Sequence, residues 1–172
     1  MKEAARKFKL LLRSSSAYAL NQYGREALVG TNEAKQAAIG DVLFSDNIQY
    51  CTAMMLNNPN LSSFWLAHFE MLQNRDLANL CIKKIIEDCG VTKFPDSKII
   101  LYQRHDPFGS MYNARANTEL LAQDLQQFGI ESQSITHMIG PSPIVIGNGI
   151  ELKEFGLKIA QRLRDAKDVR GK

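Results

Sequence analysis

The 172-residue chain is poor in cysteine: it has three, Cys51, Cys81 and Cys89, and no Cys-x-x-Cys pair. On the helix expected there, Cys81 and Cys89 would lie roughly 12 Å apart, which is too far for a disulfide. The three histidines are widely spread along the sequence, which argues against a zinc site. Because the cysteines have apolar neighbours, we expect buried structural thiols rather than a nucleophile, and no turnover that depends on them.

The chain also lacks a strong charge of one sign and a long apolar run. Its formal net charge is +3, without the dense basic patch of proteins that grip phosphates, so no nucleic-acid partner is predicted. No stretch approaches the roughly 20 apolar residues of a membrane-spanning helix. The short run Leu10–Leu12 follows basic residues, as in a signal peptide, but it is too short to be one. We expect a soluble chain, or a mature form from which an export signal has been removed.

Motifs of common catalytic and cofactor-binding sites are missing as well. The sequence contains no Gly-x-Ser-x-Gly, no His-Glu-x-x-His and no phosphate-loop lysine motif. Gly147 and Gly149 precede an expected helix, as in a dinucleotide-binding loop, but Leu152 stands where that motif needs a third glycine. We therefore predict no cofactor and no metal.

The first half of the chain reads as helical. Apolar residues recur at helical spacing over 61–72 and 77–89, and residues 74–76 divide these two segments. Asn32 or Thr31 is a candidate cap for a shorter helix over 33–39. The remaining expected elements are a helix over 2–12, a short strand over 41–44 and a turn over 57–60.

The second half predicts alternating strands and helices. The expected elements are a buried strand over 98–102, a helix over 116–128 ended by Gly129, strands within 130–139 and 143–146, and a helix over 152–163. This pattern predicts an α/β domain over 59–172, in which two helices pack on a small mixed sheet, and a helical extension over 1–58. The expected common core is Ile100, Leu101, Leu121, Leu125, Ile159 and Leu163.

The polar loop over 104–110 directly follows the clearest strand. Loops at the carboxyl ends of parallel strands are where α/β folds bind ligands. Asp106, which precedes Pro107, also fits a turn or a helix cap, so the structural and the functional interpretation both stand.

From residue 100 to about 164 the chain carries several short matches to one known pattern, in the same order. The matching residues are Ile100-Leu101-Tyr102, His105-Asp106, Gly109, Tyr112-Asn113, Leu125, Gly129-Ile130, Ile135, Gly140 and Pro143-Ile144. With these residues the chain resembles the C-terminal, peptidoglycan-associating domain of the OmpA and MotB group. The resemblance implies an α+β sandwich of that type.

The resemblance also implies a ligand site, in which an Asp and a helix Arg hold the zwitterionic end of the peptidoglycan peptide. Asp106 matches the Asp, whereas the Arg position falls on Asn117 or Leu120, and Arg115 lies two residues away from Asn117. The implied binding residues are Asp106, Gly109, Asn113, Arg115 and Asn117. Because the Arg is missing, peptidoglycan binding is expected to be weak or lost.

The resemblance implies a non-enzymatic protein of the cell envelope, in the periplasm or associated with the outer membrane. Its partners would be peptidoglycan and other envelope proteins, such as those of a secretion-system outer-membrane complex. Two other functions stay open: a cytoplasmic α/β enzyme that uses the loop over 104–110 or the Gly147 turn, and a helical adaptor that binds a partner through its N-terminal half.

Overall fold

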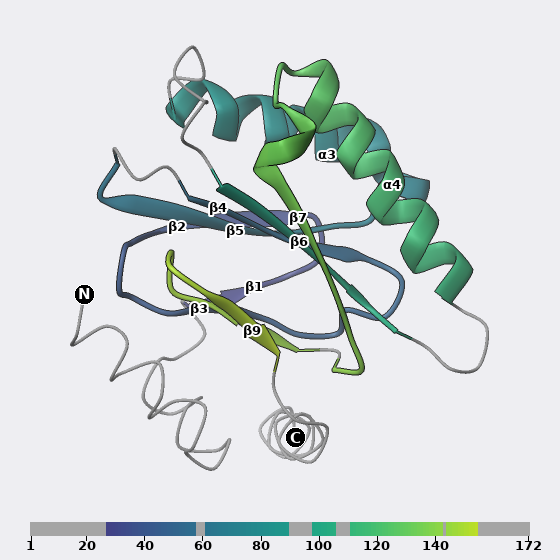
Figure 1. The fold of residues 1–172 in the computed structure, drawn as a ribbon, viewed down its shortest axis with the longest axis horizontal. Coiled ribbons are helices and arrows are strands. Elements are labelled where there is room, and N and C mark those ends of the chain that lie inside the picture. Colours follow the sequence, from purple (N-terminus) through teal and green to yellow (C-terminus); the bar gives the residue numbers. More distant parts are fainter. Residues whose placement is uncertain (1–26, 58–60, 90–97, 106–110, 143, 155–172) are drawn as a thin grey trace.

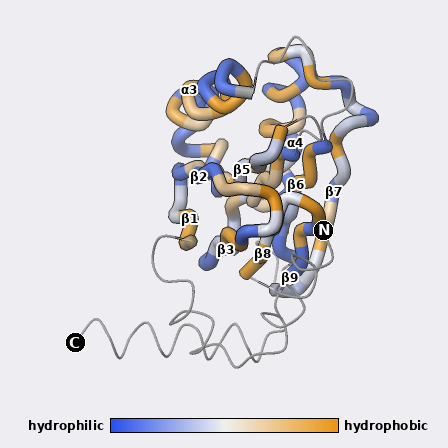
Figure 2. The backbone as a smooth tube through the Cα atoms, turned by 90° about the vertical axis from the view of Figure 1, so that its left-hand side faces the viewer, coloured by the Kyte–Doolittle hydropathy of each residue, from blue (hydrophilic) through white to orange (hydrophobic). Residues whose placement is uncertain are grey.

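The computed structural model describes residues 27–57, 61–89, 98–105, 111–142 and 144–154. These residues form three layers: helices α3 and α4, a five-stranded sheet below them, and a four-stranded sheet on the opposite side (Figure 1). Figure 2 shows the same order of layers after a quarter turn. Within the described ranges, no helix is both long and apolar enough to cross a membrane.

The five-stranded sheet is the middle layer. Its strands, in spatial order, are β2 (Glu33–Ala38), β5 (Ser63–Phe69), β4 (Thr52–Asn57), β6 (Lys98–Arg104) and β7 (Ile135–Gly140). All neighbours are antiparallel except β6 and β7, which are parallel. Helix α4 (Met111–Gln127) connects these two parallel strands, because a parallel pair needs a crossover.

The smaller sheet and the other helical segments complete the described fold. The small sheet contains, in spatial order, β1 (Leu28–Val29), β3 (Leu43–Ser45), β8 (Val145–Gly147) and β9 (Leu152–Glu154). Helix α3 (Met71–Cys89) follows β5, and the short 3-10 helix η3 (Ser132–Ser134) precedes β7. The parallel pair β1–β3 and the antiparallel β8 and β9 make this sheet mixed.

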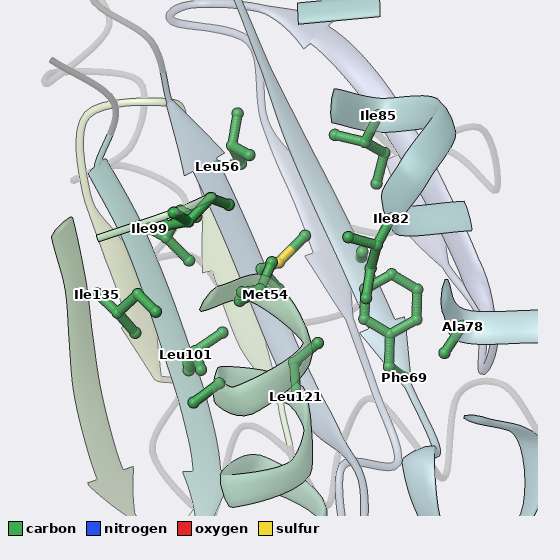
Figure 3. Packing of buried hydrophobic residues seen from close by; sticks show 14 of the residues in the cluster. Met54, Leu56, Phe69, Ala78, Ile82, Ile85, Ile99, Leu101, Leu121 and Ile135 are labelled. Atoms are coloured by element: carbon green, nitrogen blue, oxygen red, sulfur yellow. The ribbon is translucent and has the colours of Figure 1, made fainter. Parts of the chain in front are cut away.

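The face of the five-stranded sheet under the helices is apolar. Met54 and Leu101 point from the sheet toward Ile82 of α3 and Leu121 of α4, and all four side chains are at most 1% exposed (Figure 3). Leu125, one turn further along α4, belongs to the same cluster. This cluster holds the helices on the sheet.

The opposite face of the sheet packs against the four-stranded sheet. Because side chains alternate along a strand, Met55 of β4 and Phe64 and Leu66 of β5 belong to this second cluster, where they meet Leu43 and Val145 of the small sheet. The five-stranded sheet is therefore covered on both faces.

The predicted helical first half is wrong except for the segment over 77–89, which lies in helix α3. Residues 33–38 form β2 and residues 63–69 form β5, in place of the expected helices. Since β5 is covered on both faces, its residues are apolar nearly throughout, and Leu61, Trp65 and Phe69 matched a helical spacing by chance. The predicted boundary after residue 58 falls between β4 and β5, which are paired strands of one sheet.

The second half follows the prediction more closely. Strand β6, helix α4, strand β7 and strand β8 lie where they were expected, and Gly129, with a φ of 92°, ends α4. Asn74 has non-helical backbone angles inside α3, at the expected division. The expected helix over 152–163 begins instead as strand β9, and its residues beyond 154 lie outside the described ranges, as do those of the predicted helix over 2–12.

The expected common core is only partly one cluster. Leu101, Leu121 and Leu125 lie together under the helices, whereas Ile100 faces the small sheet. Ile159 and Leu163 lie outside the described residues.

Candidate functional site

The structure does not bring the predicted ligand residues together into one site. Asp106 and Gly109 lie outside the described residues. Asn113 and Arg115 are exposed on α4, and the Arg115 Nε donates to Glu119 Oε1 at 2.9 Å. Asn117 is 0% exposed, and its amide bonds to other interior groups. Arg115 and Asn117 therefore point to opposite sides of the helix.

A buried histidine lies between the two sheets. His68 on β5 is 0% exposed, and its Nδ1 lies 2.9 Å from the hydroxyl of Ser45 on β3, which is equally buried. This contact joins the five-stranded sheet to the four-stranded sheet. The other ring nitrogen, Nε2, has no hydrogen-bond partner among the described residues.

The hydrogen bonds of Ser45 assign the tautomer of His68. The Ser45 hydroxyl donates its one proton to the backbone carbonyl of Val29, at 2.8 Å. It must therefore accept a hydrogen bond from His68, which places the proton on Nδ1. Nε2 is then an unprotonated nitrogen whose lone pair is free to accept a proton.

Cys51 directly precedes β4, the strand that pairs with the His68 strand β5. In this pairing, Ala53 pairs directly with His68 and Thr52 pairs with Phe69. Cys51 lies one position before β4, so extending the strand alternation assigns it to the face of Ala53 and His68, diagonal to His68. Diagonal neighbours in antiparallel strands are about 7–8 Å apart. The carboxylate of Glu70, two residues after His68, is near enough to influence the thiol. Cys51 is 9% exposed.

Burial keeps both groups of this pair neutral at rest. Burial raises the pKa of the Cys51 thiol to about 11, and the charge of Glu70 adds to the effect. Burial lowers the pKa of the His68 imidazole to about 4, against a smaller opposing effect of Asp46. The two opposite shifts make a resting thiolate–imidazolium pair unfavourable relative to the neutral pair.

Three residue types used in nucleophilic catalysis come from these neighbouring strands. Cys51 can supply a nucleophilic sulfur, His68 can supply a base with a free lone pair, and Ser45 fixes the orientation and tautomer of that ring. A neutral imidazole can take the thiol proton as the sulfur attacks, so a resting thiolate is not required. We call Cys51, His68 and Ser45 the cysteine–histidine site.

The expectation of buried structural cysteines rested on their apolar neighbours, and Cys51 is indeed buried. The structure adds a histidine on the adjacent strand, at the diagonal position, and a hydroxyl from the other sheet that contacts this histidine. The polar loop singled out from the sequence begins next to this site, since Thr52 pairs with Gln103 and Arg104 follows directly. Recognising the site from the sequence would have required the register of β4 against β5.

The chain matches no known family model and no curated protein. Among solved structures it is similar to the Bacillus licheniformis hypothetical protein YfiH, with 10% sequence identity and a TM-score of 0.42. The match covers 75% of this chain and 57% of that one, so the chain spans little more than half the length of this neighbour.

The resemblance to the OmpA and MotB group is wrong. None of these comparisons leads to an OmpA-like domain. Four of the strands, β1 to β4, come from residues 28–57, and β3 belongs to a second sheet that the resemblance does not include. The short matches after residue 100 reflect a strand–helix–strand unit with common turn residues.

Proposed function

We propose that this protein is an acyl-transfer enzyme, either a hydrolase or a transferase, that uses Cys51 as its nucleophile. The observation that carries the proposal is the buried His68, whose Nδ1 is held by Ser45 and whose Nε2 keeps a free lone pair. A buried polar nitrogen without a partner is costly in a purely structural setting. Cys51, at the diagonal position across β4 and β5, is the thiol that we assign to this nitrogen.

The reaction has two steps, in which His68 carries one proton back and forth. The Cys51 sulfur attacks the carbonyl carbon of an amide or ester, and the thiol proton passes to His68 Nε2. The carbon–nitrogen or carbon–oxygen bond then breaks, and the leaving group takes that proton, which leaves a thioester on Cys51. Water or another acceptor attacks the thioester, gives its proton to Nε2, and the thiol is restored as the acyl group departs.

The role of Ser45 in this cycle is to hold His68. When Nε2 takes the proton, the ring becomes cationic, and the hydrogen bond from Nδ1 to the Ser45 oxygen strengthens. That bond keeps the ring plane fixed while the proton moves. The carboxylate of Asp46 favours the transient positive charge of the ring.

The non-enzymatic envelope function expected from the sequence stays a prediction without its main support. It rested on the resemblance to a peptidoglycan-associating domain, together with the envelope location and the peptidoglycan partner. The alternative of an α/β enzyme, which the sequence left open, is the one that the cysteine–histidine site favours.

The proposal is tested by trapping the acyl intermediate with p-nitrophenyl acetate. We expect a burst of nitrophenolate that approaches one equivalent per protein chain, and a mass increase of one acetyl group on the peptide that contains Cys51. The Cys51→Ala variant should lose both signals. Cys81→Ala is the matched control, because Cys81 is the other free thiol whose surroundings are described, and it lies on α3.

The histidine is tested in the same assay. His68→Gln removes the base, and acetylation of Cys51 should slow by about 10² to 10⁴-fold at pH 7. Ser45→Ala leaves the ring in place without its orienting partner and should cause a smaller loss. Acetylation of Cys51 at the same rate in the His68→Gln variant and the wild type would overturn the proposal.

A further inference from the structure

Asn117 on α4 is a fully buried side chain whose hydrogen bonds connect three elements. Its Oδ1 accepts from the backbone N–H groups of Met71 and Leu72, the latter at 3.3 Å, in the first turn of α3. Its Nδ2 donates to the Thr52 hydroxyl at 2.9 Å and to the Phe69 carbonyl at 3.0 Å. Every donor and acceptor position of the amide is used.

The two strand partners of Asn117 are the immediate chain neighbours of the cysteine–histidine site. Thr52 follows Cys51, Phe69 follows His68, and these two partners pair with each other across β4 and β5. Asn117 thus holds the last residue pair of this ladder from the helix side, on the sheet face opposite to His68.

The donor and acceptor roles in the hydrogen bonds around Asn117 are fixed. Thr118 donates its hydroxyl proton to the Ala114 carbonyl at 2.9 Å, so it accepts from the Thr52 hydroxyl at 2.7 Å. Thr52 must then accept from Asn117. A chain of hydrogen bonds therefore runs from the Asn117 amide through Thr52 into α4, and reversing the amide would break it at both ends.

We infer that Asn117 is the positioning residue of the cysteine–histidine site, an inference that rests on the proposed function. By fixing Thr52 and Phe69 it sets the backbone from which Cys51 and His68 project, and it ties that backbone to the start of α3. A displacement of about 1 Å between a nucleophile and its base can reduce the rate about 10²-fold. Asn117 itself touches neither reacting atom.

Two substitutions separate positioning of the strands from capping of the helix. Asn117→Asp keeps oxygen acceptors for the N–H groups at the start of α3, where a negative charge is favourable, but at pH 8 it cannot donate to Thr52 or Phe69. Asn117→Ala removes both functions. Asp124→Asn is the control, because it breaks the α3–α4 ion pair on the same helix without touching β4 or β5.

The experiment measures the rate of Cys51 acetylation by p-nitrophenyl acetate at pH 8, together with the thermal midpoint, for each variant. We expect Asn117→Asp and Asn117→Ala to slow acetylation about tenfold or more, and Asp124→Asn to stay within about threefold of wild type. Wild-type acetylation in the Asn117→Asp variant would overturn the inference. So would rates that fall in all three variants in proportion to the thermal midpoint.

A second measurement keeps this inference separate from the proposed function. If the wild type is not acetylated at Cys51, the proposed function fails. Whether Asn117 holds the strand that carries His68 is then measured by the solvent exchange of the His68 Nδ1–H proton in NMR spectra. That proton should lose its protection from solvent exchange in Asn117→Asp and keep it in Asp124→Asn. Equal protection in both variants would show that Asn117 does not hold the strand that carries His68.

Discussion

The two faces of the five-stranded sheet differ in what they bury. The face under α3 and α4 is filled by aliphatic side chains such as Ile82, Leu101 and Leu121 (Figure 3). The face toward the small sheet buries apolar residues as well, but it also encloses His68 and Ser45. One face therefore supplies stability through apolar area, whereas the other accepts a buried base that works against stability at acid pH.

The difference shows where the fold can hold chemistry. A buried histidine with a free nitrogen is kept only because its other nitrogen is bonded across the sheets, from β5 to β3. The apolar face also has buried polar groups, among them Asn117, but every hydrogen-bonding position of the Asn117 side chain is satisfied. Asn117 supports the site, and His68 has capacity left for a reaction.

The largest expected effect is a loss of apolar packing under the helices. Leu125 is 0% exposed, so Leu125→Ala should reduce the free energy of unfolding by about 2–5 kcal/mol in chemical denaturation. Leu80→Ala on α3 is the control, because Leu80 is 66% exposed and should cost far less. A loss below about 0.5 kcal/mol for Leu125→Ala would mean that this face of α4 does not carry the fold.

The opposite face of the sheet, which buries His68, should make the stability of the protein depend on pH. The pKa of His68 falls from 6.5 to about 4 on folding, so the unfolded chain binds a proton more readily than the folded one. The contribution of this group to stability is therefore present above pH 6.5 and is lost as the pH falls toward 4. The change over that window is on the order of 3 kcal/mol.

Denaturation midpoints measured between pH 4 and 7 check this prediction. The His68→Gln variant should have a flatter stability profile in that window, whereas His105→Gln, at an exposed position, should leave the profile unchanged. An equally steep profile in His68→Gln would contradict a buried neutral imidazole.

A smaller effect is expected where the two helices are joined at the outer side of the apolar face. Arg75 donates to both oxygens of Asp124, at 2.6 and 3.0 Å, and lowers the pKa of that carboxyl group. Because Arg75 is 44% exposed, the pair is partly screened, and Asp124→Asn should cost about 1 kcal/mol at pH 7.

The sign of its pH dependence follows from the lowered pKa. The stabilisation by Asp124 is present above the usual carboxyl pKa of 3.8 and is lost as the pH falls through the lower value of the folded state. The difference in unfolding free energy between wild type and Asp124→Asn should therefore shrink in strong acid. A difference that grows there would contradict this ion pair.

The sequence predicted the β6–α4–β7 unit because its information is local. A short apolar run, an amphipathic stripe and Gly129 each indicate their element within a few residues. Strands β2 and β5 were missed because they depend on partners far away: β5 is buried on both faces, and its apolar run carries no clear period.

The cysteine–histidine site was missed for a related reason. Cys51, His68 and Ser45 come from three different strands, and no short motif joins them. Nothing in the sequence around Ser45 indicates that its hydroxyl contacts His68, because this contact forms between the two sheets. Asn117 was singled out, but through a resemblance that the structure overturns, and its contacts depend on how α4 crosses β4 and β5.

The central claim of the proposed function is that the free Nε2 of His68 serves Cys51, and long-range proton–nitrogen NMR tests it without any substrate. At pH 7 we expect a neutral ring with its proton on Nδ1, the tautomer that free histidine disfavours, and an Nε2 resonance that shifts when Cys51 is replaced by Ala. The same spectrum should be insensitive to Cys81→Ala. A ring that carries its proton on Nε2, or an Nε2 resonance that Cys51→Ala leaves in place, would contradict the account.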